Sequence, residues 1–179
     1  DQDRLLRVVH PESPDNPWER GFVRHRNWVI VMLLLATGMR SGELLGLQIS
    51  DIKQQLSKLG VLRRADASED TRRTPVGTKT NDRELELLPG IMRALLVHIH
   101  VERHRIRAAR RHPQVFVAQD GKPLSARSIG KLFQQLRVAC PGLPVTLTSH
   151  VMRHTWNERF SEQADEMGLS EVEEARARN

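Results

Sequence analysis

Residues 36–44 read Ala36-Thr37-Gly38-Met39-Arg40-Ser41-Gly42-Glu43-Leu44, and this stretch is the strongest indication of the fold. The apolar residues before it, 24–36, are predicted to form a helix that is buried on nearly all sides and ends at Gly38. Arg40 then stands at the start of a second helix, where free backbone N–H groups and the helix dipole favour an anion. Glu43 follows on the same helix face and can hold the guanidinium in place. The stretch predicts either a phosphate site or a surface ion pair that contributes less than about 1 kcal/mol.

A second motif lies near the other end of the chain, in His150-Val151-Met152-Arg153-His154-Thr155. On a helix, His150, Arg153 and His154 project from one side, which makes that side cationic and able to exchange protons. Two histidines at this spacing also suit zinc. However, Val151 stands where the metalloprotease motif H-E-x-x-H has its glutamate, and no third ligand is evident. The prediction is a site with no metal and no cofactor, and the alternative is a histidine pair without function.

A third motif, Thr78-Lys79-Thr80-Asn81-Asp82-Arg83, precedes a predicted strand at residues 84–88. Asn81-Asp82 is a turn signal, so Lys79 is expected near the tip of a β-hairpin, from which its ammonium group can reach a substrate. The alternative is a solvated lysine that keeps the sheet edge from aggregating.

The spacing of apolar residues predicts a mainly α-helical fold with a small three-stranded antiparallel β-sheet between residues 49 and 88. The basic second half of the helix predicted over 89–111 is expected to be a solvated face. A short strand-like segment is expected at 115–117. Helices are expected over 1–10, 24–36, from 40 onward, and over 89–111, 125–139 and 148–160, with another beginning at Ser170.

Composition limits the possible classes of protein. A length of 179 residues fits one domain, and a net charge of +6 favours a polyanionic partner. The single cysteine, Cys140, cannot form an internal disulfide, so a reducing compartment is expected. The longest apolar run, residues 28–36, is much shorter than a bilayer requires, so no membrane partner is predicted. The chain contains no tyrosine.

The order and setting of the three motifs resemble those of the tyrosine recombinase, or phage integrase, family. The resemblance covers residues 26–160 and implies the catalytic-domain fold of DNA breaking-rejoining enzymes. It also implies DNA strand cleavage and rejoining, in which a tyrosine forms a 3′-phosphotyrosyl link without a metal. The site residues that it implies are Arg40, Lys79, His150 and Arg153 as catalytic groups, with Glu43 and His154 in support.

Two parts of the family pattern have no counterpart among these residues. The nucleophilic tyrosine, and the His or Trp that precedes it in the family, are both absent. We therefore expect residues 1–179 to form a single catalytic domain that is incomplete at its C-terminus, without the family's N-terminal DNA-clamping domain. Such a fragment is expected to be inactive by itself.

The resemblance implies double-stranded DNA as partner, a homotetramer on DNA for the whole protein and a monomeric fragment. A cytoplasmic, nucleoid-associated protein of bacterial or phage type is expected. A DNA-binding relative without catalysis, a type IB topoisomerase-like enzyme and a basic interaction domain with accidental motifs are the alternatives. Candidate contacts to the DNA backbone are Arg83, Lys122, Arg127 and Lys131.

Overall fold

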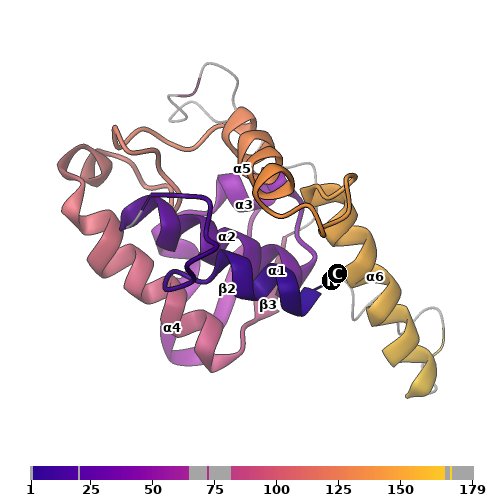
Figure 1. The fold of residues 1–179 in the computed structure, drawn as a ribbon. Coiled ribbons are helices and arrows are strands. Elements are labelled where there is room, and N and C mark those ends of the chain that lie inside the picture. Colours follow the sequence, from indigo (N-terminus) through magenta and orange to yellow (C-terminus); the bar gives the residue numbers. More distant parts are fainter. Residues whose placement is uncertain (1, 20, 65–71, 73–81, 168–169, 171–179) are drawn as a thin grey trace.

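Helix α2 lies at the centre of the fold in the computed structural model of this chain (Figure 1). The structure describes residues 2–19, 21–64, 72, 82–167 and 170. These residues form α1 (Gln2–Val9), α2 (Phe22–Thr37), α3 (Ser41–Gly46), β1 (Ile52–Lys53), β2 (Lys58–Val61), β3 (Arg83–Glu86), α4 (Pro89–Val97), α5 (Ala126–Ala139) and α6 (Ser149–Glu166), with 3-10 and π turns between them.

The burial of α2 follows from its sequence. Its apolar side chains point in all directions, and Val29, Ile30, Val31 and Leu33 have no exposed surface. A helix of this kind needs neighbours on every side, and α1, α4 and α6 all pack against it. The buried helix predicted over residues 24–36 is therefore confirmed.

The sheet is antiparallel, with the strand order β1-β2-β3. Leu59 in the central strand lies opposite Ile52 on one side and Leu85 on the other, so apolar side chains meet across the strands. A mainly helical fold with one small three-stranded antiparallel sheet was predicted, and the structure confirms it. Asn81 and the tip of the predicted hairpin lie outside the described residues.

The single long helix predicted over residues 89–111 is wrong. α4 ends at Val97, a π turn and a 3-10 turn follow, and Ile106 is extended with φ −90° and ψ 100°. The cause is Arg103, which is only 4% exposed and donates hydrogen bonds to the carbonyls of Ala109, His112 and Gln114. A buried guanidinium needs such partners, so the chain folds back around Arg103. The other arginines of this segment are exposed, in agreement with the predicted solvated face: Arg105, Arg107, Arg110 and Arg111.

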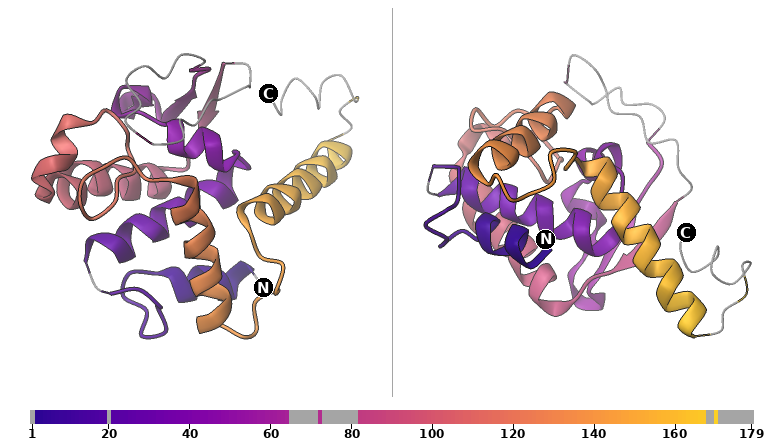
Figure 2. Two further views of the ribbon diagram at one scale, coloured as in Figure 1. Left: turned by 90° about the horizontal axis from the view of Figure 1, so that it is seen from above. Right: turned by 45° about the vertical axis from the view of Figure 1, so that its right-hand side comes forward.

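The last two helices begin where the sequence predicts, each after a residue whose hydroxyl caps it. The Ser125 hydroxyl accepts a hydrogen bond from the backbone N–H of Ser128, and Thr148 accepts one from Val151. α6 then projects from the body of the molecule (Figure 2). The predicted strand-like segment at 115–117 is an extended stretch held by isolated bridges.

Two further points concern the predicted elements. The helix expected to begin at Ser170 would run into residues 171–179, which lie outside the described residues. Within the described part of the chain, every helix is too short or too polar to cross a membrane.

Candidate active site

The first part of the candidate site is the turn between α2 and α3. Gly38 ends α2 with a left-handed φ of 58°, and Arg40 is the N-cap of α3. Glu43 Oε2 accepts a hydrogen bond from the backbone N–H of Arg40 at 2.8 Å, and Oε1 accepts one from Arg40 Nη1 at 3.4 Å. The Glu43 side chain is 2% exposed, whereas that of Arg40 is 55% exposed. The predicted contact is thus present, and it leaves most of the Arg40 guanidinium open to solvent.

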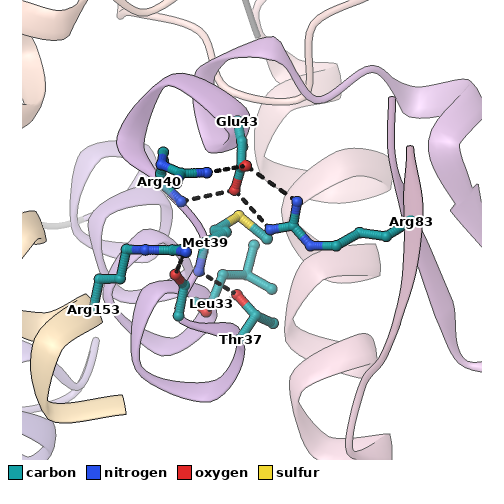
Figure 3. A network of polar contacts seen from close by, with 8 residues as sticks. Leu33, Thr37, Met39, Arg40, Glu43, Arg83 and Arg153 are labelled. Carbon is teal, nitrogen blue, oxygen red and sulfur yellow. Dashed lines mark hydrogen bonds and ion pairs between the residues drawn. The ribbon is translucent and has the colours of Figure 1, made fainter. Parts of the chain in front are cut away.

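Arg83 on β3 completes the support of Glu43. Its Nη1 and Nη2 donate to Oε1 and Oε2 of Glu43 at 3.1 and 2.8 Å, and its side chain is 10% exposed (Figure 3). This paired geometry is the strong form of a guanidinium–carboxylate contact. The sequence suggested Arg83 as a DNA-backbone contact. In the structure, the Arg83 guanidinium pairs with the carboxylate of Glu43, which is 40 residues away in the sequence. No local sequence pattern reveals this partner.

The second motif reaches the same turn from α6. Arg153 Nη1 donates a hydrogen bond to the carbonyl of Gly38 (Figure 3). This contact brings the arginine of the last motif within two residues of Arg40. The two arginines expected from the sequence are therefore placed together by the fold.

Trp156 fixes α6 against this turn, and sequence reasoning assigned it no role. Its Nε1 donates to the carbonyl of Ala36 at 3.2 Å, and a Cβ at position 38 would overlap the indole ring. Gly38 is therefore required both by its positive φ and by the close approach of the ring. The only local signal was an aromatic residue one helical turn after Arg153, on the same face.

His150 and His154 form a pair on the exposed side of α6. Their Nε2 atoms lie 3.1 Å apart, and their rings are perpendicular with centroids 4.6 Å apart. In such a contact one nitrogen donates and the other accepts, and the tautomer decides which does which. Among the described residues, no cluster of three His, Cys, Asp or Glu side chains could hold a metal ion.

The remaining predicted residues are less informative. Lys79 lies outside the described residues. Lys122 is exposed and pairs with Asp120 at 3.6 Å. Arg127 and Lys131 are exposed and one turn apart on α5. The arrangement as a whole offers two guanidinium groups and an imidazole pair, with the Glu43 carboxylate buried beside Arg40, which suits an anionic ligand.

Comparison with known proteins agrees with this chemistry. The chain belongs to the phage integrase family, whose sequence profile matches residues 4–175. Its similar relatives are tyrosine recombinases. The XerC protein of Pseudomonas syringae pv. tomato is 29% identical over 173 residues, which cover 93% of this chain and 48% of that protein. The XerD protein of Halalkalibacterium halodurans is 28% identical over 142 residues, covering 79% and 42%. The chain thus spans about half the length of the curated relatives it matches.

Solved structures of recombinases share the fold. The XerA recombinase matches with a TM-score of 0.63 and 23% identity, covering 91% of this chain and 48% of that protein. The XerH site-specific recombinase, solved in a pre-cleavage complex with its difH substrate, matches with a TM-score of 0.66 and 19% identity. That match covers 90% of this chain and 41% of XerH.

Proposed function

We propose that this chain supplies the phosphate-binding part of the catalytic domain of a site-specific DNA recombinase. The observation that carries the proposal is the convergence of Arg40 and Arg153 on the Gly38 turn. Guanidinium groups are permanently charged and planar, and they match the non-bridging oxygens of a phosphodiester. Family membership supplies the reaction class.

The proposed reaction is a transesterification without a metal. A tyrosine oxygen attacks the phosphorus atom, the bond from phosphorus to the 5′ oxygen breaks, and a proton passes to that oxygen as it leaves. Arg40 and Arg153 stabilise the charge that builds on the non-bridging oxygens. The exposed His150–His154 pair is proposed to accept the phenolic proton of the attacking tyrosine, and Lys79 to give a proton to the leaving 5′ oxygen. Because the chain contains no tyrosine, the nucleophile is proposed to lie outside these 179 residues.

Double-stranded DNA is the proposed partner. XerH is described as bound to its difH substrate, and the Tn1549 transposon integrase as bound to transposon right end DNA. The exposed side chains of Lys122 and Arg127 are proposed to contact the DNA backbone, and each such contact is expected to change the log–log salt slope by about 0.9. A homotetramer on DNA, at the nucleoid of a bacterial or phage-infected cell, is proposed for the whole protein.

Covalent capture tests the proposal. The whole native protein, with any sequence outside residues 1–179, is incubated with a duplex nicked next to the target phosphate, which prevents religation. We expect a 3′-linked protein–DNA adduct that resists denaturation and is lost in Arg40→Ala and in Arg153→Ala. Arg127→Ala is the matched control, because it removes an exposed arginine from α5 and should weaken binding without abolishing the adduct. An adduct that forms equally well in both site variants would overturn the assignment of the two arginines, whereas no adduct with the unaltered protein would favour the DNA-binding alternative.

A further inference from the structure

A pocket of about 520 Å³ lies at the start of α2, at the opposite end of the helix from Gly38. It is formed by α2, α5, the segment around Trp18 and the residues after Val117. Val23 and Ala118 line it with partly exposed apolar surface, while Trp18 and Leu132 are only 5% and 3% exposed. The exposed side chains of Glu19 and Lys131 lie at its rim. At 1.5 Å per residue along α2, the pocket is about 20 Å from Arg40. It is therefore separate from the candidate active site.

Arg26 is the unusual residue of this pocket. It is 9% exposed, and no described carboxylate forms an ion pair with it. Its Nε and Nη2 donate to Asn27 Oδ1 at 3.0 and 2.8 Å, and its Nη1 donates to the carbonyl of Val117 at 3.0 Å. Charged side chains are rarely buried without a partner of opposite charge. Burial also lowers the pKa of Arg26 to about 10, as expected for a cation without an anion beside it.

A comparison with Arg24 shows what Arg26 lacks. Arg24 makes five hydrogen bonds to the carbonyls of Pro11, Ser13, Asn16 and Trp18, so all of its N–H donors are used. Arg26 uses three of its five donors on described atoms. The face of Phe22 lies 5.5 Å from its central carbon and supplies only a weak cation–π contact. Arg26 thus retains donors and an uncompensated charge in a cavity large enough for a ligand.

The lining of the pocket indicates the class of ligand. A carboxylate accepts two parallel N–H groups from a guanidinium, and Lys131 adds a second positive charge at the rim. Val23 and Ala118 offer partly exposed apolar surface beside that charge. Duplex DNA fits poorly, because the guanidinium is recessed and Glu19 opposes a polyanion at the rim. A peptide that presents one acidic side chain between apolar neighbours fits both features.

We infer that this pocket is a docking site for an acidic segment of a partner polypeptide, with a carboxylate bound to Arg26 and apolar side chains packed on Val23 and Ala118. The site is distinct from the one that acts on DNA. It provides a way for another polypeptide to engage the recombinase without covering Arg40.

The indole N–H of Trp18 gives a local reporter, because Trp18 lines the pocket and its Nε1 donates to Gln135 Oε1 at 3.1 Å. The chain has three tryptophans, so its NMR spectrum contains three such signals, and Trp18→Phe identifies the relevant one. The probe is the capped peptide acetyl-Leu-Glu-Leu-amide, and acetyl-Leu-Gln-Leu-amide is its matched control. We expect a saturable shift of the Trp18 signal with the glutamate peptide only, while the Trp156 signal stays in place.

Variants at the rim and the floor sharpen the test. Lys131→Gln is expected to raise Kd about threefold and Glu19→Gln to lower it about threefold, as for exposed charge pairs. Arg26→Met should abolish saturation, with unchanged Trp28 and Trp156 signals as the check on folding. If that variant fails to fold, the opposite effects of the two rim variants on Kd still test whether the acidic peptide binds in this pocket. The inference fails if the glutamine peptide binds equally well, if the rim variants have no effect, or if a DNA duplex or inorganic phosphate shifts the Trp18 signal as much as the peptide.

Discussion

Arginine side chains near the two ends of helix α2 differ in their burial and in their carboxylate partners. At the C-terminal end, the buried carboxylate of Glu43 supports Arg40 and pairs with Arg83, while the Arg40 side chain remains 55% exposed. At the N-terminal end, Arg26 is buried with amide and carbonyl oxygens as its partners and without a described carboxylate. His98 is also buried at that end, stacked on Phe116 and close to Phe22.

The difference shows how one helix can serve two kinds of ligand. A guanidinium that is held by a buried acid and faces solvent can bind a phosphate of a large polyanion, because the guanidinium is already exposed. A recessed guanidinium without an acid can accept only a group small enough to enter. The position of the carboxylate, rather than the number of arginines, separates the two cases.

The largest expected effect comes from exchanging arginine for lysine at each end. Arg40→Lys in the whole protein should lower the rate of adduct formation about a hundredfold or more, because lysine does not reproduce a planar pair of donors. Its free energy of unfolding should change little, since the side chain is mostly exposed. Arg26→Lys should do the reverse, lowering stability while leaving the adduct rate within a small factor. Parallel rate and urea-unfolding measurements check the pair, and equal rate losses would remove the distinction between the two ends.

The next largest effect is expected at Glu43. Glu43→Gln leaves the Arg83 guanidinium, only 10% exposed, without its counter-charge, and should lower the free energy of unfolding by about 3 kcal/mol. Arg83→Met in the same background should recover part of that loss, because it removes the unpaired charge. A double-mutant cycle by urea denaturation measures this coupling, and additive effects of the two changes would contradict the paired geometry.

The pH dependence of stability tests the other end of α2. Burial lowers the pKa of His98 to about 3, offset only in part by the backbone of Val115, and burial also lowers the pKa of His25. Below pH 6.5, His98 therefore binds a proton in the unfolded chain and remains neutral in the folded chain. This contribution to stability is present above the unfolded pKa and is lost as pH falls toward 3. Between pH 6.5 and pH 5 the loss should be about 2 kcal/mol, at about 1.4 kcal/mol per pH unit.

His98→Phe is the control for this profile. Phenylalanine keeps an aromatic ring between Phe22 and Phe116 and has no proton to bind. The variant should flatten the dependence, leaving the smaller contribution of His25. A wild-type profile that is already flat from pH 6.5 to pH 5 would show that His98 takes up its proton in the folded state.

The smallest effect concerns the glycine that joins the two motifs. Gly38→Ala should lower the free energy of unfolding by about 1 to 2 kcal/mol, because alanine disfavours the left-handed conformation. Its Cβ also meets the Trp156 ring, so α6 must shift and adduct formation in the whole protein should fall as well. Gly130→Ala in α5 is the matched control, since nothing lies within 4 Å of its Cβ position, and it should be neutral or slightly stabilising. Equal behaviour of the two variants would refute the proposed role of the glycine.

The features that the sequence predicts correctly depend on interactions between residues only a few positions apart. The end of α2 at Gly38 and the starts of α5 and α6 near Ser125 and Thr148 depend on local backbone chemistry, and all three are present. The Arg40–Glu43 contact is also local, because three residues separate its partners.

The residues behind the wrong and the missing predictions make contacts outside their own local segment. Arg103 stops the predicted long helix by bonding carbonyls that follow it, including that of Gln114. The sequence predicts a DNA-backbone contact for Arg83 and does not reveal its pairing with Glu43, which is 40 residues away. Trp156 and Arg26 were overlooked because their surroundings exist only after the helices pack. Tertiary contacts of this kind override local propensity, and a single sequence does not display them.

The contact between Arg153 and the Gly38 carbonyl spans 115 residues, and that between Trp156 and Ala36 spans 120. Contacts this remote along the chain require closure of a very long loop and are expected to form slowly. During synthesis the first arginine emerges from the ribosome long before the second. A partly made chain therefore carries Arg40 without Arg153, and the pair of guanidinium groups exists only once Trp156 has been added and α6 has docked.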